Sequence, residues 1–298
     1  MAPRIGFFSS IGYPELEAAF RDELSSLGYV DGEDVVIVTR SSRPGTDDMT
    51  AMADELAGMN LALVVAVALP FALEVRRADP SMPMVIGTCP GLVSNGFAES
   101  LDRPGGIYTG IDELPPGVTA HRLRLLKVAA PAVTRVALLS TTPGEGGHEA
   151  QVADAEAAAA ELGVQVRPYR AASSDEVRRA LERIALDNMN GMLNFQGALS
   201  LSNRQLIVDF AAEKRIPSVY QATLFAEAGG LMSWAPDLVE QYRAAARYAD
   251  QVLRGAKPGD LPAMYPENYY LTLNSTAAQR VGLEFPDELT AQANRVVP

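Results

Sequence analysis

The feature that most constrains the fold is a regular alternation of short apolar runs with segments of helical spacing. Parallel strands need a crossover between them, and a helix is the usual crossover. The apolar runs are 5–8, 35–38, 61–68, 84–86, 136–139, 164–166, 191–195 and 218–220. The helical segments are 15–27, 47–57, 71–78, 151–162, 175–186 and 203–213. The sequence therefore predicts an α/β fold built on parallel sheets.

The second half of the chain repeats the first at a nearly constant spacing. Residues 4–10 resemble residues 135–141 in their order of polar and apolar side chains. Pro83 opens the fourth strand of the first half and Pro217 that of the second, a position where the missing N–H is tolerated. Any two βα units share part of this pattern, but successive units that stay in step favour duplication. We therefore expect two doubly wound parallel-sheet lobes.

The C-terminal region departs from the alternation. It predicts a long helix over 238–253, a loop over 255–262 and a late strand over 269–273. A strand that arrives after both sheets are built has to cross back between the lobes, so we expect a hinge of several crossovers. The predicted first lobe comprises 1–115 with about 236–266, and the second about 116–235 with 267–298.

Charge and composition exclude several classes of partner. The net charge of -12 argues against nucleic acid, which is bound by clustered Lys and Arg. The single cysteine, Cys89, excludes an internal disulfide. Together with two histidines, His121 and His148, it leaves few soft ligands for a metal ion. We expect no metal and no cofactor.

No apolar stretch reaches the length of a membrane span. The longest candidate, 61–71, is about half of the roughly 18 residues that a span needs. Residues 4–8 already read as a core strand. If the protein is exported, we expect that its leader has been removed and that Met1 is an introduced start.

Ligands of open α/β sheets bind beyond the carboxyl ends of the strands. With two sheets facing each other, we expect the cleft between them to be the site. The predicted contacts are Ser9, Ser10, Tyr13, Leu69, Pro70, Thr88 and Cys89 in the first lobe, and Ser140, Thr141, Gln196, Tyr220 and Gln221 in the second. Most of the polar groups are uncharged hydroxyls and amides, which indicates binding rather than acid–base catalysis. Ordinary helix capping by Ser and Thr is the alternative for each one.

Helix starts near these positions offer free N–H groups. Pro70 in the first turn of its helix leaves the amides of 69–72 as a predicted carboxylate site. Cys89 either lines the cleft or is an inert small apolar side chain.

Trp234 and the two histidines have competing interpretations. Trp234 lies between a Gly pair and Pro236, where we expect a loop; it either stacks on a ligand or fills the core. His148 follows a Gly-rich stretch that lacks the Lys-Ser/Thr of a phosphate loop, so we expect a flexible loop there. His121 lies in a helix over 119–128 beside two arginines, where we expect it to be solvated.

Four motifs resemble a known family. They are RPGGIYTG at 103–110, EAGGLMSWAP at 227–236, LRGAKPGDLP at 253–262 and LNSTAAQRVGL at 273–283. The chain is similar along its whole length to ABC transporter substrate-binding proteins of the tryptophan-binding-like group, within the type I periplasmic binding fold. The Gly pairs and prolines of the motifs fix turns around the hinge.

The resemblance implies a periplasmic or lipid-tethered protein that delivers a solute to a membrane permease and neither binds ATP nor catalyses a reaction. Characterised members hold amino acids, with an acidic residue opposite the ammonium group. Here Thr88-Cys89-Pro90 and Gln196-Gly197 stand where relatives often place Asp. An ammonium group buried without a countercharge is costly. We therefore expect a neutral or carboxylate-bearing solute, aromatic ones included, rather than an α-amino acid.

Two other classes remain open. An α/β hydrolase or transferase uses the same kind of sheet, but the chain has no Gly-x-Ser-x-Gly elbow and few His and Cys residues. A ligand-sensing effector domain would need a fused DNA-binding or signalling segment.

Overall fold

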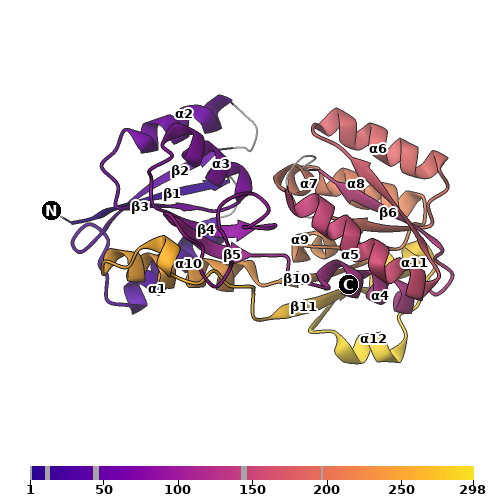
Figure 1. Ribbon diagram of the computed structural model, residues 1–298. Helices are drawn as coiled ribbons and strands as arrows, with labels where there is room; N and C mark the ends of the chain where they lie inside the picture. Colours follow the sequence, from indigo (N-terminus) through magenta and orange to yellow (C-terminus); the bar gives the residue numbers. More distant parts are fainter. Residues whose placement is uncertain (1, 11–13, 43–46, 142–145, 196) are drawn as a thin grey trace. The chain divides into compact units, whose positions relative to one another are not determined.

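The structure is a computed structural model that describes residues 2–10, 14–42, 47–141, 146–195 and 197–298 (Figure 1). The chain divides into two compact units. Unit 1 is Met1–Leu114 with Asp237–Pro266, and unit 2 is Pro115–Pro236 with Glu267–Pro298. The chain therefore passes from one unit to the other after Leu114, after Pro236 and after Pro266.

Unit 1 is built on a five-stranded parallel sheet in the order β2-β1-β3-β4-β5. Its strands are β1 (Arg4–Ser10), β2 (Val36–Ser42), β3 (Leu63–Ala66), β4 (Met84–Cys89) and β5 (Tyr108–Asp112). Its helices are α1 (Pro14–Ser26), α2 (Asp47–Ala57), α3 (Leu69–Ala78) and α10 (Leu238–Leu253), with a short 3-10 turn at Pro258–Asp260. Strands β1, β3 and β4 coincide with apolar runs of the sequence and are buried along almost their whole length.

Helix α10 returns from the C-terminal part of the chain to complete the unit 1 core. Phe7 of β1 contacts Phe20 of α1 at 5.1 Å and Tyr242 of α10 at 6.2 Å between ring centroids. The buried Tyr242 hydroxyl donates to the Val67 carbonyl, just beyond β3. Asp237 caps α10 by accepting a hydrogen bond from the Val239 N–H at 2.8 Å. The long helix predicted over 238–253 is confirmed.

Unit 2 is built on a seven-stranded sheet in the order β12-β11-β10-β9-β8-β6-β7. Its strands are β6 (Arg135–Ser140), β7 (Gln165–Arg170), β8 (Gly191–Asn194), β9 (Ser218–Tyr220), β10 (Met232–Pro236), β11 (Tyr269–Asn274) and β12 (Arg295–Val297). Its helices are α4 (Val118–Ala129), α5 (Gly146–Leu162), α6 (Ser174–Leu186), α7 (Ala198–Ser202), α8 (Arg204–Glu213), α9 (Thr223–Glu227), α11 (Ser275–Val281) and α12 (Asp287–Gln292). Only β10 and β11 pair antiparallel among these strands.

Helices cover both faces of the unit 2 sheet. Successive side chains of a strand point to opposite faces, so each strand contributes to the core on either side. Leu138 of β6 packs in a cluster with residues of α4 and α5. Its neighbour Leu139 packs in a second cluster with residues of α6 and α8. The expected class, two parallel-dominated α/β sheets covered by helices, is confirmed.

Strands β5, β10 and β12 did not stand out as apolar runs. Strand β5 carries Thr109, Gly110 and Asp112, and β10 carries Ser233 and a terminal proline. The loop that we expected at Trp234 is wrong, since Trp234 is the central residue of β10 and pairs with Leu271 of β11. A Gly pair and a proline mark the two ends of a strand here, rather than a loop.

Among the described residues, no helix combines the length and apolar character needed to cross a membrane.

Close approach of backbones at Gly110 gives a stability test. Gly110 has φ +151°, and a Cβ there would overlap the Ile86 carbonyl oxygen and lie 2.8 Å from the Ile86 nitrogen. We expect Gly110→Ala to lower the free energy of unfolding by about 3 kcal/mol. The control is Gly106→Ala, because Gly106 has φ +63° with nothing within 4 Å of a Cβ and should cost only about 1 kcal/mol. Equal denaturation midpoints for the two variants would contradict the clash.

Candidate functional site

The carboxyl ends of the unit 1 strands bring several of the predicted polar residues to one edge of the sheet. Ser10 ends β1 and Cys89 ends β4. The hydroxyls of Ser9 and Ser41 lie 2.7 Å apart, and Thr88 donates to the Val67 carbonyl at 3.0 Å. These hydroxyls therefore hold the strand ends in place as well as lining the edge. Tyr13 lies outside the described residues.

Helix α3 begins without a side-chain cap. Its N-cap is Ala68, and Pro70 occupies the first turn. The prediction that all amides over 69–72 are free is wrong, because the N–H groups of Phe71 and Ala72 donate to the Ala68 carbonyl at 3.0 and 3.1 Å. The Leu69 side chain is buried in the core, so only its backbone belongs to the edge. The helix start still offers the partial positive charge of its dipole.

Two buried acidic residues, Asp112 and Glu113, lie beside Cys89 at this edge of the sheet. The Asp112 carboxylate accepts hydrogen bonds from the N–H groups of Gly91, Leu92 and Leu114 at 3.1, 2.9 and 3.0 Å. Burial raises the pKa of Asp112, and the three backbone donors oppose that rise. The Asp112 carboxylate therefore stabilises the loop that follows β4.

Glu113 follows Asp112 and is also buried, at 7 % exposure. Its N–H donates to the Cys89 carbonyl at 2.8 Å, which fixes it at the end of β4. Burial raises the pKa of Tyr242, and the negative charge of Glu113 raises it further. Glu113 was not predicted as a site residue, because it follows a strand that is not an apolar run. Gln241, in the first turn of α10, was also missed; its amide atoms are buried with no partner among the described residues.

A second set of polar side chains lies at the carboxyl edge of the unit 2 sheet. Ser140 ends β6, and the buried Thr141 hydroxyl has no hydrogen-bond partner within the described part of the chain. Gln221 follows β9 and donates from its side-chain amide to Gln151 of α5 at 2.5 Å. The side-chain oxygen of Asn194, at the end of β8, accepts from Ser200 at 2.8 Å. Gln196, a predicted contact, lies outside the described residues.

His148 lies in the first turn of α5 and is 2 % exposed. The flexible loop expected at His148 is therefore wrong: α5 begins at Gly146, earlier than predicted, and buries the ring. Its centroid is 6.1 Å from that of Phe195, and neither ring nitrogen has a partner among the described residues. Desolvation and the charge of Arg170 lower the pKa of His148, while Glu149 opposes them.

Trp234 is packed among aromatic and cationic side chains of its own unit. Its ring stacks on Tyr269 at 4.4 Å and 20°, and contacts His121 at 4.2 Å. The guanidinium of Arg122 lies 5.7 Å from the ring centroid and donates to the Trp234 carbonyl at 3.0 Å. The expectation that His121 is solvated is wrong, since it is half-buried against this ring. Stacking of Trp234 on a ligand stays a prediction.

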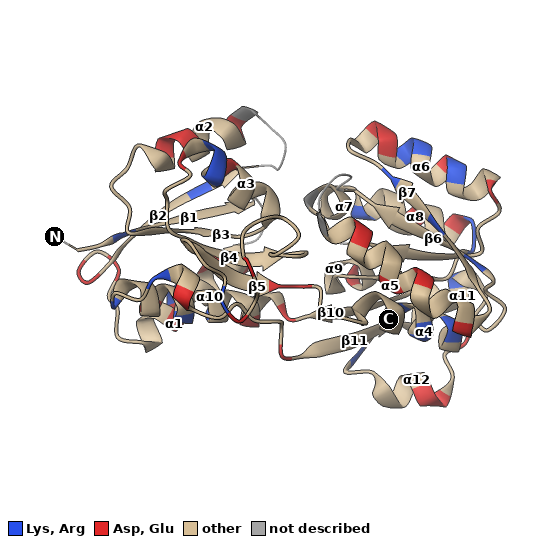
Figure 2. Cartoon of the chain, in the orientation of Figure 1, with Lys and Arg blue, Asp and Glu red and all other residues tan. Residues whose placement is uncertain are grey.

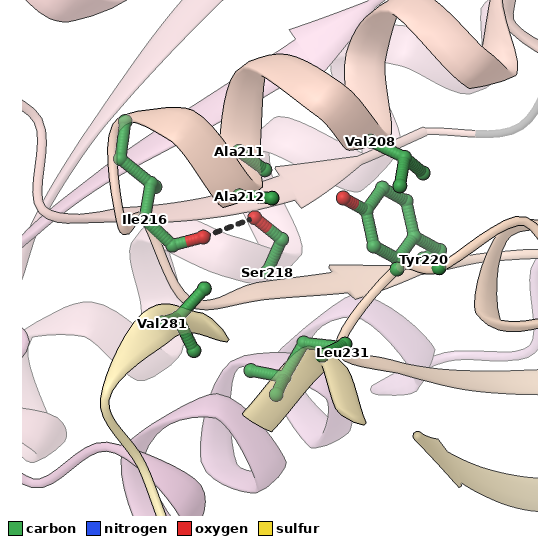
Figure 3. A pocket seen from close by; sticks show the side chains of 11 residues that line it. Val208, Ala211, Ala212, Ile216, Ser218, Tyr220, Leu231 and Val281 are labelled. Carbon is green, nitrogen blue, oxygen red and sulfur yellow. Dashed lines mark hydrogen bonds between the residues drawn. The ribbon is translucent and has the colours of Figure 1, made fainter. Parts of the chain in front are cut away.

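Tyr220 points into the core rather than along the edge. Its ring is fully buried and stacks on Phe225 at 4.8 Å and 8°. Figure 3 shows it lining a small recess with Val208, Ile216, Ser218 and other side chains. The recess has a volume of about 10 Å³ for a water-sized guest, which is room for one water molecule and not for an organic solute.

Charged residues lie in bands on outer helices such as α6 (Figure 2). On this helix Arg178 pairs with Asp175 at 2.9 Å and Arg179 with Glu176 at 3.8 Å. These are exposed pairs, which contribute little to stability. Within the described ranges, no group of three or more His, Cys, Asp or Glu side chains is arranged to hold a metal ion.

Two α/β units with polar groups at their strand ends are an architecture that hinge-type solute-binding proteins use. The chain belongs to the family described as ABC transporter substrate binding protein, whose profile matches residues 8–297. The expected family and its role in solute binding are confirmed. The family is one of binding proteins rather than enzymes, acts outside the cytoplasmic membrane, and implies a small-molecule solute and a permease.

Individual relatives are distant in sequence. The chain is 22% identical over 284 residues to a tyrosine-binding protein of Clostridioides difficile (strain R20291), covering 94% of this chain and 81% of the relative. A structure of an ABC domain in complex with L-Trp from Streptococcus pneumonia has a TM-score of 0.91 at 24% identity, covering 100% of both chains. A conserved domain protein from Vibrio cholerae has a TM-score of 0.90 at 22% identity, covering 99% of this chain and 100% of that one. These structures establish the shared fold.

The two histidines predict a pH dependence of stability. Burial comes first among the causes that lower the pKa of His121 and His148 below 6.5. The folded chain therefore takes up fewer protons than the unfolded chain, so stability is present above pH 6.5 and is lost as the pH falls below it. We expect His148→Gln to reduce the drop in melting temperature between pH 7 and about 5.5. A drop as large as that of the parent protein would contradict the burial of a neutral ring.

Proposed function

We propose that the chain captures an aromatic amino acid and hands it to an ABC permease without chemical change. The observation that carries this proposal is the buried carboxylate of Glu113 at the carboxyl edge of unit 1. The names of relatives support it, since one is a tyrosine-binding protein and another was solved with L-Trp. The further proposals are that the protein acts in the periplasm, by a lipid anchor or free, and binds no nucleic acid.

Glu113 supplies the countercharge whose absence made an amino acid unlikely from the sequence. From the sequence, an acidic partner for the ammonium group was expected only after the fourth strand or at residue 196. Glu113 reaches the same edge from β5, where its N–H bonds the last residue of β4. An ammonium group brought to this edge would meet a negative charge that is already largely removed from water, where charge pairs are strong.

The carboxylate of the proposed solute has a complementary partner in the same unit. The uncapped start of α3 presents the positive end of a helix dipole. The hydroxyls of Ser9 and Thr88 lie near the carboxyl ends of β1 and β4, which β3 separates in the sheet. An α-amino acid carries both charges on one carbon, so the two groups of unit 1 suit its two ends. The sequence expectation of a neutral or carboxylate-bearing solute remains the competing prediction.

A panel of paired ligands tests the proposal. We expect L-tyrosine or L-tryptophan to raise the melting temperature, and their deaminated analogues, 4-hydroxyphenylpropionate and indole-3-propionate, to raise it much less. Glu113→Gln should weaken amino-acid binding on the order of 10- to 100-fold, because a hydrogen bond to a charged group is lost. Calorimetry measures the affinities.

The matched control is Glu33→Gln, which removes an exposed acid of the same unit and should leave binding unchanged. Tighter binding of the deaminated analogues than of the amino acids would reject the amino-acid proposal and favour the competing prediction.

Hinge closure, expected from the sequence, remains to be tested. The chain passes between its units three times, and a ligand that touches both would shift the population toward a closed form. We expect saturating L-tyrosine to reduce the radius of gyration in small-angle scattering, with glycine as the unbound control. Superimposable profiles at proven saturation would speak against closure.

A further inference from the structure

His148 is a buried polar side chain with no hydrogen-bond partner in the part of the chain that the structure describes. It is 2 % exposed, and both Nδ1 and Nε2 lack a partner among the described residues. Buried polar groups in folded proteins are nearly always hydrogen-bonded to protein, water or ligand. The ring therefore lies where a partner from outside the described chain is expected.

The surroundings of His148 place it at the carboxyl edge of the unit 2 sheet. Its ring lies 6.1 Å from the ring of Phe195, and the Phe195 N–H donates to the Leu139 carbonyl at 2.8 Å. Thr141, two residues beyond Leu139, carries a second buried hydroxyl without a partner in the described part of the chain. The Gln151–Gln221 pair joins α5 to the end of β9. Buried polar side chains of α5 and of the residues after β6 and β9 thus belong to this edge.

The charge state of the ring limits what it can recognise. Desolvation is the main cause that lowers the pKa of His148. The charged groups that act on it are Arg170 and Glu149, which pair with each other at 3.3 Å on the surface. The ring is therefore neutral near pH 7, with one N–H donor and one acceptor nitrogen. Which nitrogen carries the proton is decided by the partner.

We infer that His148 is a specificity-determining residue of unit 2 that accepts a hydrogen bond from a hydroxyl group of the solute and selects a hydroxylated aromatic side chain over a bare one. This inference rests on the proposed function. A phenol hydroxyl both donates and accepts, as the neutral ring and Thr141 do. Phe195, in the core beside the His148 ring at 6.1 Å, makes the surroundings of the ring apolar, which strengthens a hydrogen bond made there.

Paired affinities for L-tyrosine and L-phenylalanine test this role. The parent protein should bind L-tyrosine at least 10-fold more tightly, because a site built for a hydroxyl rejects the analogue that lacks it. His148→Phe should bring the ratio to about 1 by weakening tyrosine alone. His148→Gln keeps a donor and an acceptor and should retain part of the preference, and it remains informative if the Phe variant does not fold. His121→Gln, which changes the other histidine, should keep the full ratio.

Nuclear magnetic resonance gives a readout that a merely structural role would not move. The chain has two histidines, so ¹⁵N-histidine labelling gives two imidazole patterns, which His121→Gln assigns. L-tyrosine should shift the His148 nitrogens by several ppm and L-phenylalanine should not.

The outcomes separate this inference from the proposed function. Equal affinities for the two amino acids in the parent protein, or unshifted His148 nitrogens in the tyrosine complex, would overturn the inference while the proposed function stands. Failure of every aromatic amino acid to bind would remove the proposed function and the inference together. A shift of His148 alone with a ratio that collapses in His148→Phe would support both.

Discussion

Parallel pairing of strands is the constraint on which both units depend. Because each crossover returns the chain to the same side, the ends of β1, β3 and β4 meet at one edge of unit 1, and those of β6, β8 and β9 meet at one edge of unit 2. The last residues of the strands and the loops after them carry the polar side chains, while the rest of each buried strand is filled by apolar side chains. Recognition and stability therefore occupy different parts of the same elements.

The two edges use their polar groups differently. In unit 1, the side chains of Thr88, Asp112 and Tyr242 form hydrogen bonds to backbone groups of the edge itself. These bonds hold the strand ends in place. In unit 2, the side chains of Thr141 and His148 are buried without a hydrogen-bond partner in the described part of the chain, a state that Gln241 shares in unit 1. A pre-formed edge lowers the entropy lost when a solute binds. A buried polar group without a protein partner lowers the free energy of the complex only when the solute supplies a matching hydrogen-bonding group. Such a group therefore discriminates between solutes.

The alternation of the sequence was sufficient to predict the sheets, since buried parallel strands read as continuous apolar runs. It failed where a strand carries small or polar residues, as at Gly110 in β5 and Ser233 in β10. The same limit hid two residues of the candidate site. Glu113 follows β5, and His148 follows a Gly-rich start that reads as a loop although α5 begins at Gly146. Both positions depend on tertiary burial, which local spacing does not report.

The discontinuity of the units has a consequence for biosynthesis. Phe7 packs against Tyr242, which is synthesised after the first and longer segment of unit 2, Pro115–Pro236. Until α10 emerges from the ribosome, the aromatic face of the N-terminal sheet is uncovered, and β10 likewise waits for β11. A nascent chain of this topology exposes apolar surface for most of its synthesis, so it stays unfolded for longer than a protein made of two successive domains. That delay makes the growing chain a substrate for chaperones.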